Sequence, residues 1–68
     1  MANRTLGQPL SNVHQRELRA WIEHEGLERV AARLGVTTYL AARAAAGATM
    51  HPGSCLLVHA GLERRRAA

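Results

Sequence analysis

The sequence predicts a small all-α domain, a compact bundle of four or at most five helices. Apolar residues recur at spacings of three and four along most of the 68-residue chain, which is the period of an amphipathic helix. Glycines stand where the first three of these patterns stop, and no stretch shows the sustained alternation of β-branched residues typical of strands. A chain of this length forms one domain with a thin core, so a partner subunit would add stability.

Residues 1–10 show no helical period and are predicted to form a flexible arm, followed by the domain over residues 11–68. The sequence patterns then predict four helices, at Ser11–Glu25, Leu27–Leu34, about Thr37–Ala46 and about Pro52–Arg64. Ser11 or Asn12 is expected to cap the first helix, and Thr37 the third. Trp21 falls on the apolar stripe of the first helix and is assigned to the core, while Gly61 is expected to cost the fourth helix a little stability.

Residues 30–41 have the order of a helix-turn-helix, in which a short helix, a tight turn and a capped helix follow one another. Gly35 can adopt the positive φ that the turn needs, Ala31 lets the second helix cross close to the first, and Val36 fills the turn. A pair of this kind projects its second helix from the globule, which is the geometry that enters a DNA major groove.

With these features in place, residues 27–62 resemble the helix-turn-helix of the lambda-repressor-like family, the group of Cro and the phage repressors. The positions that carry the resemblance are Ala31, Gly35, Thr37, Gly47, Pro52 and the apolar run Leu56–Leu62. The family usually has bulky aliphatic residues at the core positions of the third helix. This chain has Ala41 and Ala44 there, so Leu40 is expected to turn inward. The resemblance implies a repressor-type transcription regulator of bacterial or phage type that binds double-stranded DNA as a homodimer.

On this interpretation, the helix at about residues 37–46 lies in the major groove. The predicted DNA-binding residues are Arg29, Arg33, Thr37, Thr38, Tyr39 and Arg43. Arg43 is the expected base reader, because arginine can bond guanine at two positions, and the other two arginines are expected to contact phosphates. A net charge of +4 and a pI near 11.1 suit a polyanionic partner.

The fourth helix is apolar on more than one face. Cys55, Val58 and Leu62 point one way and are assigned to the core. The second set, Leu56, Leu57 and Ala60, is assigned to a homodimer interface; the alternative is that Leu56 or Leu57 covers the core beneath the arm.

The sequence predicts neither a metal-binding site nor a catalytic site. His51, Cys55 and His59 recur at i, i+4 and i+8, and neighbours in this set could share a zinc ion, but the outer pair drifts apart and no fourth ligand is evident, so no metal site is predicted. The chain has no aspartate, no glycine-rich phosphate loop and no nucleophile set beside a base, so neither enzymatic activity nor a cofactor is expected.

Two other functions stay open on the sequence. One is a helical protein–protein adaptor that has kept the fold but not the DNA face, and the other is a nucleoid-associated protein with weak sequence preference. The lone cysteine and the lack of a leader or a long apolar run predict a cytoplasmic protein without membrane association. The short chain leaves no room for an effector domain, so no small-molecule effector is expected.

Overall fold

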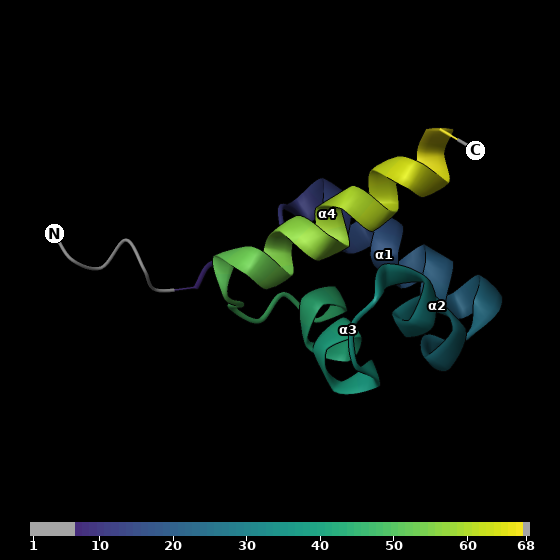
Figure 1. The fold of residues 1–68 in the computed structure, drawn as a ribbon, viewed down its shortest axis with the longest axis horizontal. Helices are drawn as coiled ribbons and strands as arrows, with labels where there is room; N and C mark the ends of the chain where they lie inside the picture. Colours follow the sequence, from purple (N-terminus) through teal and green to yellow (C-terminus); the bar gives the residue numbers. More distant parts are fainter. Residues whose placement is uncertain (1–6, 68) are drawn as a thin grey trace, which may run out of the picture.

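The computed structural model describes residues 7–67, and over this range it contains four α-helices and no strand. These are α1 (Asn12–Glu25), α2 (Leu27–Leu34), α3 (Thr38–Ala45) and α4 (Pro52–Ala67) (Figure 1). The predicted all-α class and all four helices are therefore confirmed, with α4 running on to Ala67 instead of ending near Arg64. Within the described part of the chain, no helix combines the length and the apolar character needed to cross a bilayer.

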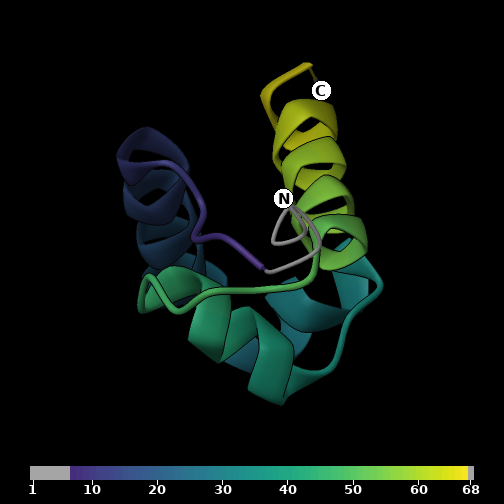
Figure 2. The same ribbon diagram turned by 90° about the vertical axis from the view of Figure 1, so that its left-hand side faces the viewer.

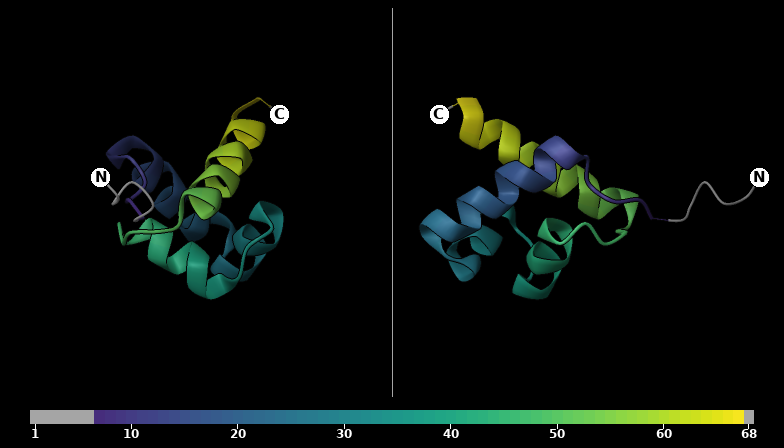
Figure 3. Two further views of the ribbon diagram at one scale, coloured as in Figure 1. Left: turned by 60° about the vertical axis from the view of Figure 1, so that its left-hand side comes forward. Right: turned by 180° about the vertical axis from the view of Figure 1, so that it is seen from behind.

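The helices are arranged with α1 and α4 on one side of the molecule and α3 on the opposite side (Figures 2 and 3). The short helix α2 packs against all three of the others and joins the two sides. Because two turns of helix are unstable alone, α2 depends on these contacts for its conformation.

The core lies between the four helices. Trp21 is 2% exposed, which confirms its assignment, and Leu40 is half-buried against the core, as expected from the slim α3. The buried apolar residues are Leu10, Leu18, Trp21, Val30, Ala31, Leu34, Ala41, Ala44, Ala45, Met50, Val58 and Leu62. The buried residues of α3 are the alanines Ala41, Ala44 and Ala45, and their short side chains let the helix pack close to its neighbours.

Gly61 lies at the closest approach of α4 to α2. It is buried, and a Cβ atom at this position would lie 2.2 Å from Leu34 Cδ2. The small helix-propensity cost expected for Gly61 is not tested, but the structure adds a packing reason for this glycine, because the missing side chain makes room for Leu34 in the core. Helical periodicity alone does not reveal which glycine faces another helix.

The chain segment before α1 is packed, not free. Gln8 and Met50 exchange two backbone hydrogen bonds of 3.0 and 3.1 Å, and Leu10 is 5% exposed. The predicted flexible arm is thus wrong for residues 7–10, which form a strap over the connection between α3 and α4. The rest of the predicted arm, residues 1–6, lies outside the described residues.

Candidate nucleic-acid interface

Helix α3 is fixed at both ends. Gly35, at φ 77°, turns the chain out of α2, and the Thr37 hydroxyl accepts a 3.0 Å hydrogen bond from the Leu40 amide. At the other end, Arg19 of α1 donates to the carbonyl of Ala45 over 3.0 Å. These contacts satisfy terminal backbone groups that would otherwise need water, so the orientation of α3 is set by the fold.

The outer face of α3 carries the residues that the sequence predicted for DNA contact. Tyr39 is 70% exposed, and Thr37 and Thr38 are exposed at the start of the helix. Arg43 is half-buried: its guanidinium carbon lies 5.6 Å from the centroid of the Tyr39 ring, and it donates to the carbonyl of Thr49 over 3.1 Å. A guanidinium has five N–H donors, so these contacts orient Arg43 and leave donors for a ligand.

The other side chains on this face are small. Ala42 and Ala46 are exposed beside Tyr39 and Arg43. A face of this shape lets the helix backbone come close to a flat or grooved partner, while only two long side chains reach outward. It can therefore bind closely but offers few groups that distinguish one base from another.

Arg29 and Arg33 do not join this face. Arg33 lies with Trp21 and Arg64 at the seam of α1, α2 and α4, with its Nε atom 3.6 Å from a carboxylate oxygen of Glu25. Arg29 lies at the α1–α2 junction beside acidic neighbours, Glu25 and Glu28. The structure thus brings together Thr37, Thr38, Tyr39 and Arg43 and separates the two α2 arginines from them, because α2 buries the stripe Val30, Ala31 and Leu34 and directs Arg33 toward the end of α4.

Four further arginines take structural roles that the sequence did not reveal. Arg19 holds the end of α3, Arg64 donates to the Arg33 carbonyl over 3.3 Å, and Arg65 lies 5.0 Å from the centroid of the Trp21 ring. Arg66 is bonded to Glu17, whose hydrogen bond and charge raise the pKa of Arg66 above its ordinary value. These contacts depend on how distant helices meet, and no local pattern signals them.

The stretch of chain that contains α3 carries no acidic residue. None of the five glutamates lies between Arg29 and Leu62, a stretch that contains all of α3 and its flanking turns. The long charged side chain on the outer face of α3 is a cation, so a phosphate approaching this face meets no carboxylate from these segments.

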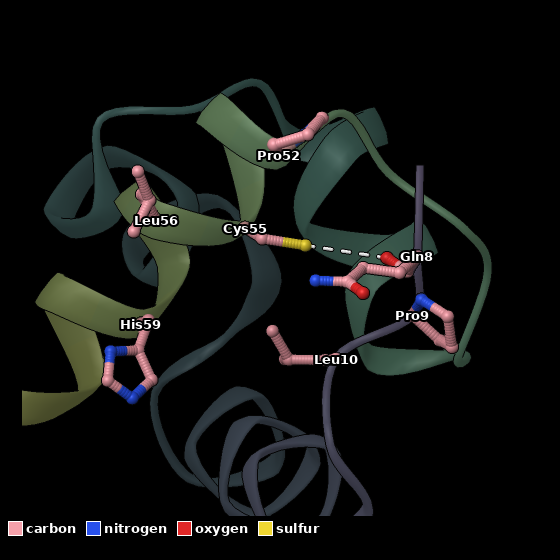
Figure 4. A pocket seen from close by; sticks show the side chains of 7 residues that line it. All are labelled: Gln8, Pro9, Leu10, Pro52, Cys55, Leu56 and His59. Carbon is pink, nitrogen blue, oxygen red and sulfur yellow. Dashed lines mark hydrogen bonds between the residues drawn. The ribbon is translucent and has the colours of Figure 1, made fainter. Parts of the chain in front are cut away.

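The second apolar face of α4 points to solvent. Leu56 and Leu57 are 69% and 49% exposed, and Ala60 is exposed as well. The core assignment is confirmed, because Val58 and Leu62 are buried and Cys55 is half-buried against the core. Leu56 lines an open pocket together with residues of the strap and is still 69% exposed, which argues against the alternative that it closes the core (Figure 4).

The potential metal ligands do not group as the spacing of His51, Cys55 and His59 along the sequence suggests. In residues 7–67, the one group of three that could hold a metal ion is His14, His59 and Glu63. His59 thus meets a histidine from α1 and does not form a ligand set with His51 and Cys55. The sequence missed this group, because the relevant spacing exists only after α1 and α4 have packed together.

The chain was compared with known protein families, with curated proteins and with solved structures, and none of the three comparisons found a match.

The cap of α3 gives a direct test of how the outer face is positioned. Thr37→Ala removes the hydroxyl that accepts from the Leu40 amide, and we expect a loss of about 1 kcal/mol in the free energy of unfolding. Urea unfolding followed by circular dichroism measures this change. Thr38→Ala, one residue later and exposed, is the matched control and should change stability by less than about 0.5 kcal/mol. Equal losses in both variants would contradict the capping role.

Proposed function

We propose that the protein is a small DNA-binding regulator of the repressor type that places α3 in the major groove. The observation that supports this most directly is the outer face of α3, where Tyr39 and Arg43 project from a helix whose ends are fixed by the fold. A rigid helix on the outside of a small basic domain is the arrangement used by helix-turn-helix proteins. A cytoplasmic location belongs to the same proposal.

In this proposal each residue of the α3 face has a DNA contact that suits its chemistry. Arg43 would bond a guanine edge or a phosphate, and its contact with Tyr39 limits the directions it can take. Thr37 and the free amides at the start of α3 would hold a phosphate near the groove edge. Because Ala42 and Ala46 read little, one copy of the domain should bind DNA with modest sequence preference.

A homodimer through Leu56, Leu57 and Ala60 is the second part of the proposal. Two exposed leucines side by side on one helix are a natural site for burial against a second copy. Pairing would present two α3 helices to the duplex and so raise both affinity and specificity. The same surface would serve the adaptor function if the protein failed to bind DNA.

DNA binding can be tested with a fluorescently labelled random duplex in an anisotropy titration. Because Arg43 is the one cation of this face, a dimer would neutralise about two phosphates, and affinity should fall roughly 12-fold between 50 and 200 mM salt. Arg43→Gln should weaken binding about tenfold, since it removes the one long cation of this face. Arg65→Gln has the same change in charge at the far end of α4 and is the matched control, expected to change affinity less than threefold. Absence of binding at low salt would contradict the proposal and favour the adaptor.

The dimer is tested by sedimentation of the full chain at several concentrations. We expect a dimer that Leu57→Glu converts to a monomer, because a carboxylate would be buried at the interface without a partner. Val13→Glu, at another exposed apolar position in α1, should leave the dimer intact. A wild-type protein that stays monomeric at high concentration would rule out this interface.

A further inference from the structure

Two histidines and a glutamate meet where α1 crosses α4. His14 comes from the first turn of α1, and His59 and Glu63 are one turn apart on α4. Each residue offers one ligand atom, and these three atoms all lie within 4.8 Å of one another. The two imidazole rings meet edge to face, with centroids 4.4 Å apart and an interplanar angle of 86°.

The His14 ring is oriented by a second contact. Ser11, the N-cap of α1, has its hydroxyl oxygen 3.0 Å from His14 Nδ1. When Nδ1 carries the proton and donates it to this hydroxyl, Nε2 has the free lone pair that a metal ligand needs. Metal-binding histidines commonly have one ring nitrogen held in this way by a neighbouring group.

The α4 ligands share one face of their helix. His59 Nε2 lies 3.9 Å from Glu63 Oε2, the expected relation of side chains at i and i+4. Ligand atoms around a tetrahedral zinc ion lie roughly 3.3 Å apart, given metal–ligand bonds of about 2.0–2.1 Å. All three side chains reach solvent in part, so rotations about their side-chain bonds can bring the ligand atoms together.

We propose that His14, His59 and Glu63 bind a divalent transition-metal ion of the zinc class and thereby join α1 to α4. Two imidazole nitrogens and one carboxylate oxygen are a ligand set that suits zinc, and a fourth position stays open to water. The fold supplies the site without help from Cys55, whose Sγ atom lies 3.4 Å from the Gln8 carbonyl oxygen.

Arg66 is the competing cation. Its Nη1 atom lies 3.6 Å from Glu63 Oε2, but its shorter bond is to Glu17. Arg66 can therefore keep Glu17 as its partner while Glu63 turns to the metal. It follows that Arg66→Gln should tighten metal binding a few-fold, because it removes a positive charge beside the ligand carboxylate.

The site would act as a cross-link in a domain whose single cysteine cannot form an internal disulfide. Metal that binds the folded chain and not the unfolded one adds its binding free energy to stability. The two helices that carry the site, α1 and α4, lie on the opposite side of the molecule from α3 (Figure 3). Metal binding and DNA binding can therefore succeed or fail independently.

The test uses the full chain, freed of metal with a chelator and titrated with zinc chloride in a calorimeter. We expect one zinc ion per chain, and a rise in melting temperature of roughly 10–20 °C at about 100 times the dissociation constant. Loading with cobalt(II) should give the intense visible bands of four-coordinate geometry. One ion per two chains, or no rise in melting temperature at saturating zinc, would overturn the proposal.

Variants assign the ligands. His14→Ala, His59→Ala and Glu63→Gln should each weaken zinc binding at least tenfold, and circular dichroism without metal should show them folded. The matched controls are His24→Ala on α1, His51→Ala before α4 and Cys55→Ser, which should bind zinc within threefold of the wild type. Unchanged binding in His59→Ala, or losses in His51→Ala or Cys55→Ser as large as in His14→Ala, would show that the ion binds elsewhere.

Discussion

Replacing Gly61 with valine is expected to destabilise the domain by about 3 kcal/mol and leave much of the chain unfolded at 25 °C. The backbone of α4 passes so close to α2 that even a Cβ atom would lie 2.2 Å from Leu34 Cδ2. Leu34 is itself 2% exposed, so any new position of its side chain has to be found within the packed core. The larger valine side chain would force the two helices apart and open the core along their whole contact.

Gly53 provides the control within the same helix. No atom lies within 4 Å of the position that a Cβ would take there, and the residue is helical. Gly53→Ala should therefore raise the free energy of unfolding by up to about 1 kcal/mol, through the helix propensity of alanine. Urea denaturation of both variants measures the contrast. If Gly61→Val were as stable as Gly53→Ala, the close approach of α4 to α2 would be wrong.

Leu34→Ala is expected to have the second large effect, a loss of about 2–5 kcal/mol. Leu34 contributes one of the largest fully enclosed side chains of the core, and its truncation leaves a cavity between α2 and α4. Thermal unfolding followed at 222 nm should show a melting temperature lower by at least about 10 °C.

Combining the two positions sharpens this prediction. In Leu34→Ala the methyl group that meets Gly61 is gone, so Gly61→Ala should then be tolerated and should fill part of the cavity. The double variant Leu34→Ala/Gly61→Ala should be more stable than Leu34→Ala alone, with a coupling of about 1 kcal/mol or more between the sites. Strict additivity would mean that the two residues do not contact each other as described.

The sequence predicted the helices well, because their ends are set by local chemistry. Ser11 and Thr37 cap α1 and α3 through their own hydroxyl groups, and Gly26 and Gly35 both have the positive φ that ends a helix. These signals act within a few residues, so they can be read along the chain.

The candidate site was only partly predictable, because a helical wheel gives the outer side of one helix but not its neighbours. The exposed side of α3 follows from its periodicity, and Tyr39 lies there as expected. Arg33 also lies outward on α2, yet it faces the end of α4, which the sequence alone does not place. The cluster of His14 with His59 likewise depends on how α1 crosses α4.

The strap formed by residues 7–10 makes the single thiol of the chain a reporter of local opening. Cys55 Sγ lies 3.4 Å from the Gln8 carbonyl oxygen, so the strap partly covers the sulfur (Figure 4). Besides Cys55, the strap is held by a pair of backbone bonds to Met50, by a 2.7 Å hydrogen bond from Gln15 Nε2 to the Leu10 carbonyl and by the burial of Leu10, and these contacts can break while the four helices stay packed. Its detachment is therefore a low-energy fluctuation compared with global unfolding. The rate at which an alkylating reagent modifies Cys55 consequently measures how often the strap detaches from Met50 and Cys55.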